Sequence, residues 1–103
     1  MPYEIALSAT AANDLRSLRP FDRAKVAHQI DAQLQSQPLV ETRNRKPLRM
    51  EEGLLPFEHV PPVWELRVGG LRVYYDVEKD AGVVNVRAVR RKPPHRTTKE
   101  SRK

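Results

Sequence analysis

Apolar and polar residues alternate along residues 63–77, VWELRVGGLRVYYDV, on both sides of a Gly69-Gly70 pair. Alternation with a period of two predicts β-strands with one buried face, and the glycine pair predicts a two-residue hairpin turn. The turn sets a register that gathers the apolar side chains on one face. On the other face it places Arg67 opposite Arg72, although like charges directly opposite each other normally destabilise a sheet. The pair therefore indicates a face that holds an anion, with an RNA phosphate as the favoured candidate.

Periodicities elsewhere predict the rest of the fold. Residues 3–7 alternate and predict a first short strand, while apolar residues at helical spacing predict helices over residues 9–18 and about 20–36. Residues 37–62 hold five of the nine prolines and predict a long connection. Residues 83–91 alternate again and extend the hairpin to a meander. We therefore expect an α+β fold in the order β-α-α-β-β-β, with two N-terminal antiparallel helices packed on one face of a small, mostly antiparallel sheet.

The last predicted strand adds arginines to the polar face of the hairpin. Its alternation predicts a register in which Arg87 lies beside Tyr74. Arginine suits a phosphate because its planar guanidinium donates two parallel hydrogen bonds. Glu65 and Asp76 could neutralise part of the cluster, so a solvated, salt-bridged surface is the alternative to an anion site. The residues predicted on this face are Arg67, Arg72, Tyr74, Arg87 and Arg91.

Composition restricts the classes of function. The 103 residues suffice for one domain with a single core, and the absence of cysteine excludes disulfides and thiolate metal sites. Neither a basic segment before an apolar stretch nor a long apolar run is found, so we expect a cytoplasmic protein without a signal peptide or a membrane span. The three histidines are too scattered for a zinc site, and no glycine-rich phosphate loop is present. We therefore expect no metal and no cofactor.

The net charge of +6 is concentrated at the C-terminal end of the chain. Residues 87–103 hold eight basic side chains against Glu100, a balance of +7, whereas residues 1–40 balance to zero and residues 41–86 to −1. A basic block of this kind indicates a contact with nucleic acid or with a partner protein. A solvated terminus is an equally good interpretation of the block by itself.

Three motifs together resemble a known family: KPLR at residues 46–49, WELRVGGLRVYYDV at residues 64–77 and VVNVRAVRRK at residues 83–92. In their order they are similar to the RelE/ParE superfamily of toxins from bacterial type II toxin–antitoxin systems, with the RelE-like branch favoured. The predicted order of strand, helix, helix and three-stranded meander is similar as well. The resemblance implies a single RelE-like toxin domain over residues 1–92, followed by a basic C-terminal tail over residues 93–103.

For the RelE-like branch the resemblance implies a toxin that enters the ribosomal A site and cleaves mRNA without a metal. The 2′-hydroxyl attacks the adjacent phosphate, so the enzyme needs a base, phosphate-binding cations and an acid for the leaving group. By position, Arg72 and Arg67 correspond to basic hairpin residues, of which Arg72 matches the one that contacts the scissile phosphate. Lys92 corresponds to the basic residue just past the last strand, whereas strand parity favours Arg91, and both stay open. The predicted RNA-binding set is Arg67, Arg72, Arg87, Arg91, Lys92 and Lys46.

Two departures from the superfamily pattern bear on the base and the acid. Glu65 stands where the most active relatives place a lysine, so it either acts as the base or pairs with Arg67 or Arg72. The C-terminal tyrosine of those relatives has no counterpart here, and His95 is the nearby side chain that titrates near neutral pH. The predicted catalytic set is therefore Arg72, Arg67, His95 and Glu65.

These departures keep two other functions open. One is a ParE-like toxin that inhibits DNA gyrase and has no nuclease activity, and the other is an attenuated, non-toxic module that binds its antitoxin. In each case the resemblance implies a cognate antitoxin as partner and allows a toxin–antitoxin hetero-oligomer. The nuclease would also bind the ribosome and mRNA, and each phosphate that Lys or Arg neutralises would make this binding more sensitive to salt. No membrane partner is expected.

Overall fold

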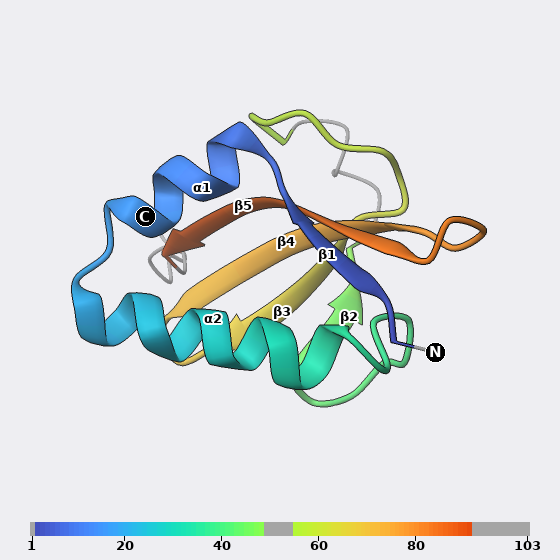
Figure 1. Ribbon diagram of the computed structural model, residues 1–103, viewed down its shortest axis with the longest axis horizontal. Coiled ribbons are helices and arrows are strands. Elements are labelled where there is room, and N and C mark those ends of the chain that lie inside the picture. The colour runs from blue at the N-terminus through green and yellow to red at the C-terminus, as the bar shows by residue number, and fades with distance from the viewer. Residues whose placement is uncertain (1, 49–54, 92–103) are drawn as a thin grey trace, which may run out of the picture.

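The computed structural model describes residues 2–48 and 55–91 of the chain. Two helices lie on one face of a five-stranded sheet with the strand order β1-β5-β4-β3-β2 (Figure 1). Neighbouring strands are antiparallel except β1 and β5, which are parallel. The predicted α+β fold with N-terminal helices is therefore confirmed. The elements in chain order are β1 (Glu4–Leu7), α1 (Ala9–Arg16), α2 (Pro20–Leu34), β2 (Arg45–Pro47), β3 (Trp64–Val68), β4 (Leu71–Glu78) and β5 (Val83–Arg91).

Ser8 connects β1 to α1 and fastens the start of the helix to the sheet. Its hydroxyl accepts a hydrogen bond from the Ala11 amide at 3.0 Å, which makes it the N-cap of α1, and donates one to the Arg87 carbonyl at 2.9 Å. Pro20 then starts α2 at a helical position that needs no amide donor. The chain reverses direction between the helices, so that α1 packs along β5 and α2 crosses β3 and β4 (Figure 1).

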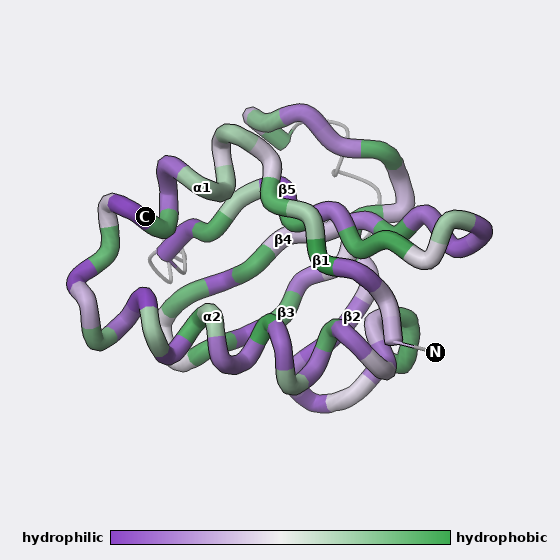
Figure 2. Tube along the Cα trace, viewed as in Figure 1, coloured by the Kyte–Doolittle hydropathy of each residue, from purple (hydrophilic) through white to green (hydrophobic). Residues whose placement is uncertain are grey.

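The core lies between the helices and the apolar face of the sheet. Val26, Ile30 and Leu34 recur every four residues along α2 and are almost fully buried. Figure 2 shows hydrophilic segments between apolar ones along this helix, as expected when a single helical face is buried. The facing strands supply side chains that are 0% exposed, namely Leu66, Val73, Tyr75, Val84 and Val86. The predicted register of the hairpin is confirmed, with Trp64 opposite Tyr75 and Arg67 opposite Arg72.

β2 is a strand within residues 37–62, the segment that was predicted to be a long connection. It pairs antiparallel with β3, with Arg45 opposite Leu66. Arg45 is only 4% exposed, and its Nη1 atom donates to the Gln33 carbonyl at 2.7 Å, so it ties β2 to the end of α2. Three residues are too few to show a period of two, and a tertiary contact rather than local pattern therefore defines this strand.

A β-bulge changes the register between β4 and β5. Tyr75 lies opposite Val86 as predicted, but the next pair is Tyr74 with Ala88, so that Arg87 is the additional residue of the bulge. The predicted position of Arg87 beside Tyr74 is therefore wrong. The extra residue moves every later side chain of β5 to the opposite face, since side chains alternate along a strand.

The bulge also exchanges the positions of the last two arginines of β5. Arg90 lies opposite Arg72, whereas Arg91 lies opposite Leu71, which belongs to the core. The Arg91 guanidinium is 4.0 Å from the carboxylate of Asp22 on α2, on the side that the helices cover. The expectation that strand parity brings Arg91 to the polar face is wrong, and Arg90 has that position. The role of Arg91 in RNA binding stays a prediction.

Tyr75 gives the folded state a dependence on alkaline pH. Its ring is fully buried, its hydroxyl donates to the Pro38 carbonyl at 2.6 Å, and burial raises its pKa well above the ordinary value. A pKa raised by folding contributes stability below the unfolded-state value of about 10 and loses that contribution as the pH rises through it. We therefore expect the free energy of unfolding to fall steadily above a pH of about 10.

Tyr75→Phe tests this expectation. The variant removes the hydroxyl and leaves the Pro38 carbonyl without its partner, which should lower the free energy of unfolding at pH 8 by about 1–2 kcal/mol. Between pH 9 and 11, by contrast, its stability should decline less steeply than that of the unmodified protein, in urea unfolding followed by circular dichroism. Equal slopes for the two proteins would show that Tyr75 ionises as easily in the folded chain as in the unfolded one.

Candidate phosphate-binding site

The two arginines that oppose each other at the end of the hairpin have different surroundings. Arg72 on β4 is 6% exposed, and its Nε atom is 3.1 Å from a carboxylate oxygen of Glu65 on β3. Its Nη1 atom also donates to the carbonyls of Gly69 and Leu71, at 3.1 and 2.9 Å. These contacts hold the guanidinium in one orientation before any ligand arrives, and Glu65 balances its charge.

Arg67 is the exposed member of the pair. Among the described residues no carboxylate forms an ion pair with it, while its backbone amide donates to the Asn44 carbonyl at 2.8 Å. Both arginines line a groove of about 590 Å³ between α2 and the tip of the hairpin, where Lys25 adds a third positive charge. An exposed guanidinium beside a fixed one, in the lining of a positively charged groove, is suited to binding a phosphate group.

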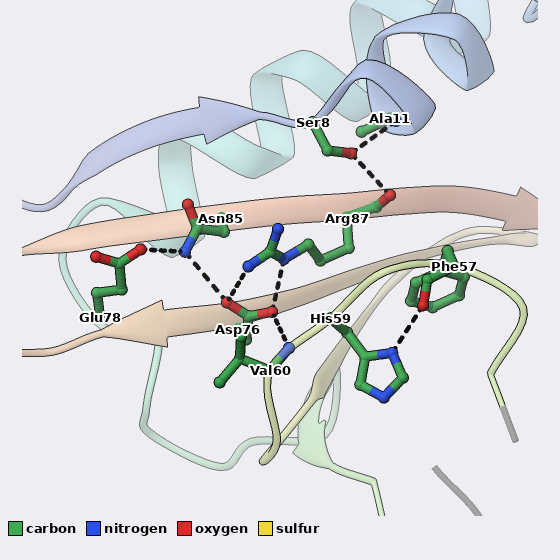
Figure 3. Close-up of polar contacts among 9 residues, drawn as sticks. All are labelled: Ser8, Ala11, Phe57, His59, Val60, Asp76, Glu78, Asn85 and Arg87. Atoms are coloured by element: carbon green, nitrogen blue, oxygen red, sulfur yellow. Dashed lines mark hydrogen bonds and ion pairs between the residues drawn. The ribbon is translucent and has the colours of Figure 1, made fainter. Parts of the chain in front are cut away.

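The part of the polar face near β5 is organised around a buried carboxylate instead. Asp76 on β4 is 2% exposed and receives two hydrogen bonds from Arg87, at 2.7 and 3.2 Å (Figure 3). Further donors are the Val60 amide at 2.9 Å and the Asn85 side-chain amide at 3.1 Å. The hydrogen bond with Asp76 raises the pKa of Arg87 further. Arg87 is thus occupied within the protein, and its predicted contact with RNA would require a change in this network.

Residues from the connection before β3 cover a neighbouring part of the same face. The ring of Phe57 lies 5.5 Å from that of Tyr74, and the guanidinium of Arg90 lies 5.7 Å from the centre of the Phe57 ring. His59 points a ring nitrogen at the Phe57 carbonyl, at 2.8 Å (Figure 3). Burial, followed by the charge of Glu65, raises the pKa of Tyr74. The exposed arginine face predicted from the sequence is therefore reduced to its end near the hairpin turn.

Asp14 on α1 forms hydrogen bonds with the edge of β5 beyond the end of β1. One of its carboxylate oxygens accepts from the Val89 amide at 2.9 Å and from Arg90 Nε at 3.0 Å. Arg90 is therefore balanced in charge, as Arg72 and Arg87 are. On the polar face of the described strands, Arg67 is the arginine without a carboxylate partner.

The other predicted site residues are distributed around this centre or lie outside the described residues. Lys46 on β2 is exposed and stands opposite Glu65, two strands away from Arg72, beside a separate pocket. Lys92 and His95 lie outside the described residues. The structure thus brings together Glu65, Arg67 and Arg72, and it separates Arg87 from them through the ion pair with Asp76.

Several residues of the site were missed in the sequence analysis. Lys25, Gln29 and Gln33 on α2 line the groove together with Asn44. The spacing of four residues between Lys25, Gln29 and Gln33 was a sequence signal for a polar surface on α2, since it places the three side chains on one ridge. Within residues 2–48 and 55–91, no three or more side chains of His, Cys, Asp or Glu cluster in a way that could hold a metal ion. In the same part of the chain, neither helix is long and apolar enough to span a membrane.

The fold and the site define a small α+β protein with a cationic site at the tip of a β-hairpin. Residues 5–92 match the family model described as the ParE toxin of type II toxin–antitoxin systems, parDE, and the chain belongs to this family. The chain is thus a type II toxin of the RelE/ParE superfamily. A comparison with curated protein sequences finds no match.

Solved structures of RelE proteins share the fold. The RelBE2 toxin–antitoxin complex from Mycobacterium tuberculosis contains a chain with 28% identity and a TM-score of 0.70, over 89% of this chain and 93% of that one. A chain of the archaeal RelE–RelB complex from Pyrococcus horikoshii has 18% identity and a TM-score of 0.66, over 88% and 96%. A mutant RelE toxin from E. coli in the free state has 20% identity and a TM-score of 0.56, over 88% and 84%.

Proposed function

We propose that this toxin is a ribosome-dependent mRNA endoribonuclease that inhibits translation and is neutralised by a cognate antitoxin. The observation that carries the proposal is the exposed Arg67, which forms no ion pair with a described carboxylate and lies opposite the immobilised Arg72 in a groove that Lys25 also lines. The similarity to the RelBE2 complex supports both the toxin class and the antitoxin partner, in a toxin–antitoxin hetero-oligomer. The ribosome would present the mRNA to this site.

In the proposed reaction the ribose 2′-hydroxyl attacks the adjacent phosphate and displaces the 5′-oxygen of the next nucleotide, without a metal ion. Negative charge grows on the phosphate oxygens, and Arg67 would stabilise it through charge-assisted hydrogen bonds. Arg72 would supply a second, fixed cation. Because Glu65 contacts the Arg72 guanidinium at 3.1 Å, it is suited to orienting that group, and a role as the base would compete with this ion pair. His95 remains the candidate acid or base that titrates near neutral pH.

Arg67→Ala tests the proposal directly. The side chain is exposed and forms no ion pair with a described residue, so its loss should leave the thermal stability unchanged. Cleavage of mRNA on purified bacterial ribosomes, mapped by primer extension, should fall by about 100-fold or more, as when one transition-state donor is removed. Arg16→Ala on α1, which changes an exposed arginine that does not line the groove, is the matched control. If Arg67→Ala cleaves as fast as the unmodified toxin, the phosphate contact assigned to Arg67 is wrong.

A second candidate function is inhibition of DNA gyrase without nuclease activity. The match to the ParE family model favours it, and so does Glu65, which balances the charge of Arg72 where a nuclease would use free cations. Supercoiling by purified gyrase, assayed with increasing toxin and no ribosomes, distinguishes the two. Inhibition of gyrase together with absence of mRNA cleavage would replace the first proposal with the second.

A further inference from the structure

The groove beside Arg67 contains a ridge of amide side chains that the proposed cleavage chemistry does not use. Gln29 and Gln33 stand one turn apart on α2, and Asn44, in the segment that precedes β2, lines the same groove. The two glutamines are half-buried, which limits the rotamers they can adopt. Amide groups offer a donor and an acceptor side by side, and this combination is the one that pairs with the edge of a nucleobase.

The two glutamines hold each other in place. Gln33 Nε2 donates to Gln29 Oε1 at 2.6 Å, and neither amide has another side-chain partner among the described residues. The pair therefore leaves the Nε2 group of Gln29 and the Oε1 atom of Gln33 available. If both amides were turned over, one NH₂ group and one oxygen would still remain free. The ridge thus presents a pre-arranged donor and acceptor to the groove.

Positive charge lies at the end of the ridge nearest the hairpin turn. Lys25 is one turn before Gln29, and its Nζ atom would be 3.3 Å from a Cβ atom built on Gly69. Gly69 has a φ angle of +60°, so the turn both requires glycine and leaves room for the lysine head. Lys25 and Arg67 thus line the same groove, the first from α2 and the second from β3.

From this arrangement we propose that the groove binds one nucleotide of single-stranded RNA next to the phosphate contacted by Arg67. The edge of its base would bond to Gln29 and Gln33, and its own phosphate to Lys25. The groove volume of about 590 Å³ is within the range of small-ligand sites. The inference rests on the proposed nuclease function and adds to it a determinant of base preference. An acidic segment of the antitoxin is the other occupant with suitable charge, but charge alone would not make use of the paired amides.

Base preference supplies the first test. The double variant Gln29→Ala/Gln33→Ala should still cleave ribosome-bound mRNA, but its preference between the best and the second-best base should fall by about tenfold. Cleavage sites would be mapped by sequencing of RNA ends, at matched extents of reaction. Gln35→Ala, an exposed glutamine at the end of α2 outside the groove, should keep the original preference. An unchanged preference in the double variant would overturn the proposal and leave the nuclease function intact.

Direct binding supplies a second test that does not depend on cleavage. We would titrate ¹⁵N-labelled toxin with pentaribonucleotides that carry A, C, G or U at the centre, and follow the side-chain NH₂ signals of Gln29, Gln33 and Asn44. These signals should shift more for one central base than for the others, and Lys25→Ala should weaken binding while Lys79→Ala on the β4–β5 turn should not. Shifts in a toxin that cleaves no mRNA would support the groove assignment and reject the nuclease. Absence of shifts with RNA, together with shifts on adding the antitoxin, would assign the groove to the antitoxin.

Discussion

Replacing Arg72 with alanine is expected to lower the free energy of unfolding by about 3–5 kcal/mol and to abolish mRNA cleavage. Both effects come from one environment, because the guanidinium is almost completely enclosed and is bonded to Glu65 and to the carbonyls of Gly69 and Leu71. Its removal leaves the Glu65 carboxylate, whose side chain is 12% exposed, without its partner in a poorly solvated position. Urea unfolding gives the first quantity, and primer extension on purified ribosomes gives the second.

Loss of activity in Arg72→Ala could therefore follow from loss of the hairpin structure. The double variant Arg72→Met/Glu65→Leu separates the two causes, because apolar residues of similar volume often replace a buried ion pair with little change in stability. We expect this variant to unfold close to the midpoint of the unmodified toxin and to remain inactive. A folded double variant that cleaves mRNA normally would show that Arg72 acts in the structure of the hairpin alone.

The second large effect is expected for Asp76→Ala. Asp76 accepts four hydrogen bonds from three groups, which are Arg87, the Val60 amide and the Asn85 side chain (Figure 3). Its loss leaves Arg87 partly buried and unpaired, and we expect the free energy of unfolding to fall by about 3–5 kcal/mol. The Val60 amide should also lose its protection from hydrogen exchange, because Asp76 holds this segment against the sheet.

Glu78→Ala is the matched control for Asp76→Ala. Glu78 accepts from the same Asn85 side chain at 2.9 Å, but it is exposed, so its removal should cost about 0.5–1 kcal/mol at most. Equal losses for the two variants would mean that Asp76 is no more important than a surface carboxylate. Unchanged exchange at the Val60 amide would mean that the segment is held by Phe57 and its neighbours instead.

The hairpin shows how much of the candidate site the sequence determines. A strict period of two on both sides of Gly69-Gly70 permits one register that buries the apolar side chains, since a slip of one residue would expose all of them. Arg67 and Arg72 are therefore opposed in the structure as predicted. The N-cap at Ser8 and the apolar ridge of α2 from Val26 to Leu34 are predictable from the sequence for the same reason, because each depends on residues close together in the chain.

The third strand of the meander shows where local pattern was insufficient. Ala88 and Val89 are adjacent apolar residues, and both are buried, on opposite faces of the sheet. This adjacent apolar pair was a sequence signal for the bulge. The alternation along residues 83–91 is, however, equally compatible with a strand that has no bulge. The bulge, together with the contact between Arg90 and Asp14 on α1, decides which arginine faces Arg72.

By itself the sequence determined the class of fold, the hairpin register and the presence of two opposed arginines, because these follow from the short-range periodicity of the chain. The tertiary structure alone decided which of the described cations have a carboxylate partner. Arg72, Arg87 and Arg90 each have a carboxylate partner, and in two of the three pairs the partner comes from another strand or helix more than ten positions away in the chain. The groove also depends on the tertiary structure, since Lys25 on α2 and Arg67 on β3 line one cavity only when the helix packs across the sheet. The ion pairs and the shape of the groove both depend on distances between residues that are far apart in the chain. The order of residues along the sequence does not contain those distances.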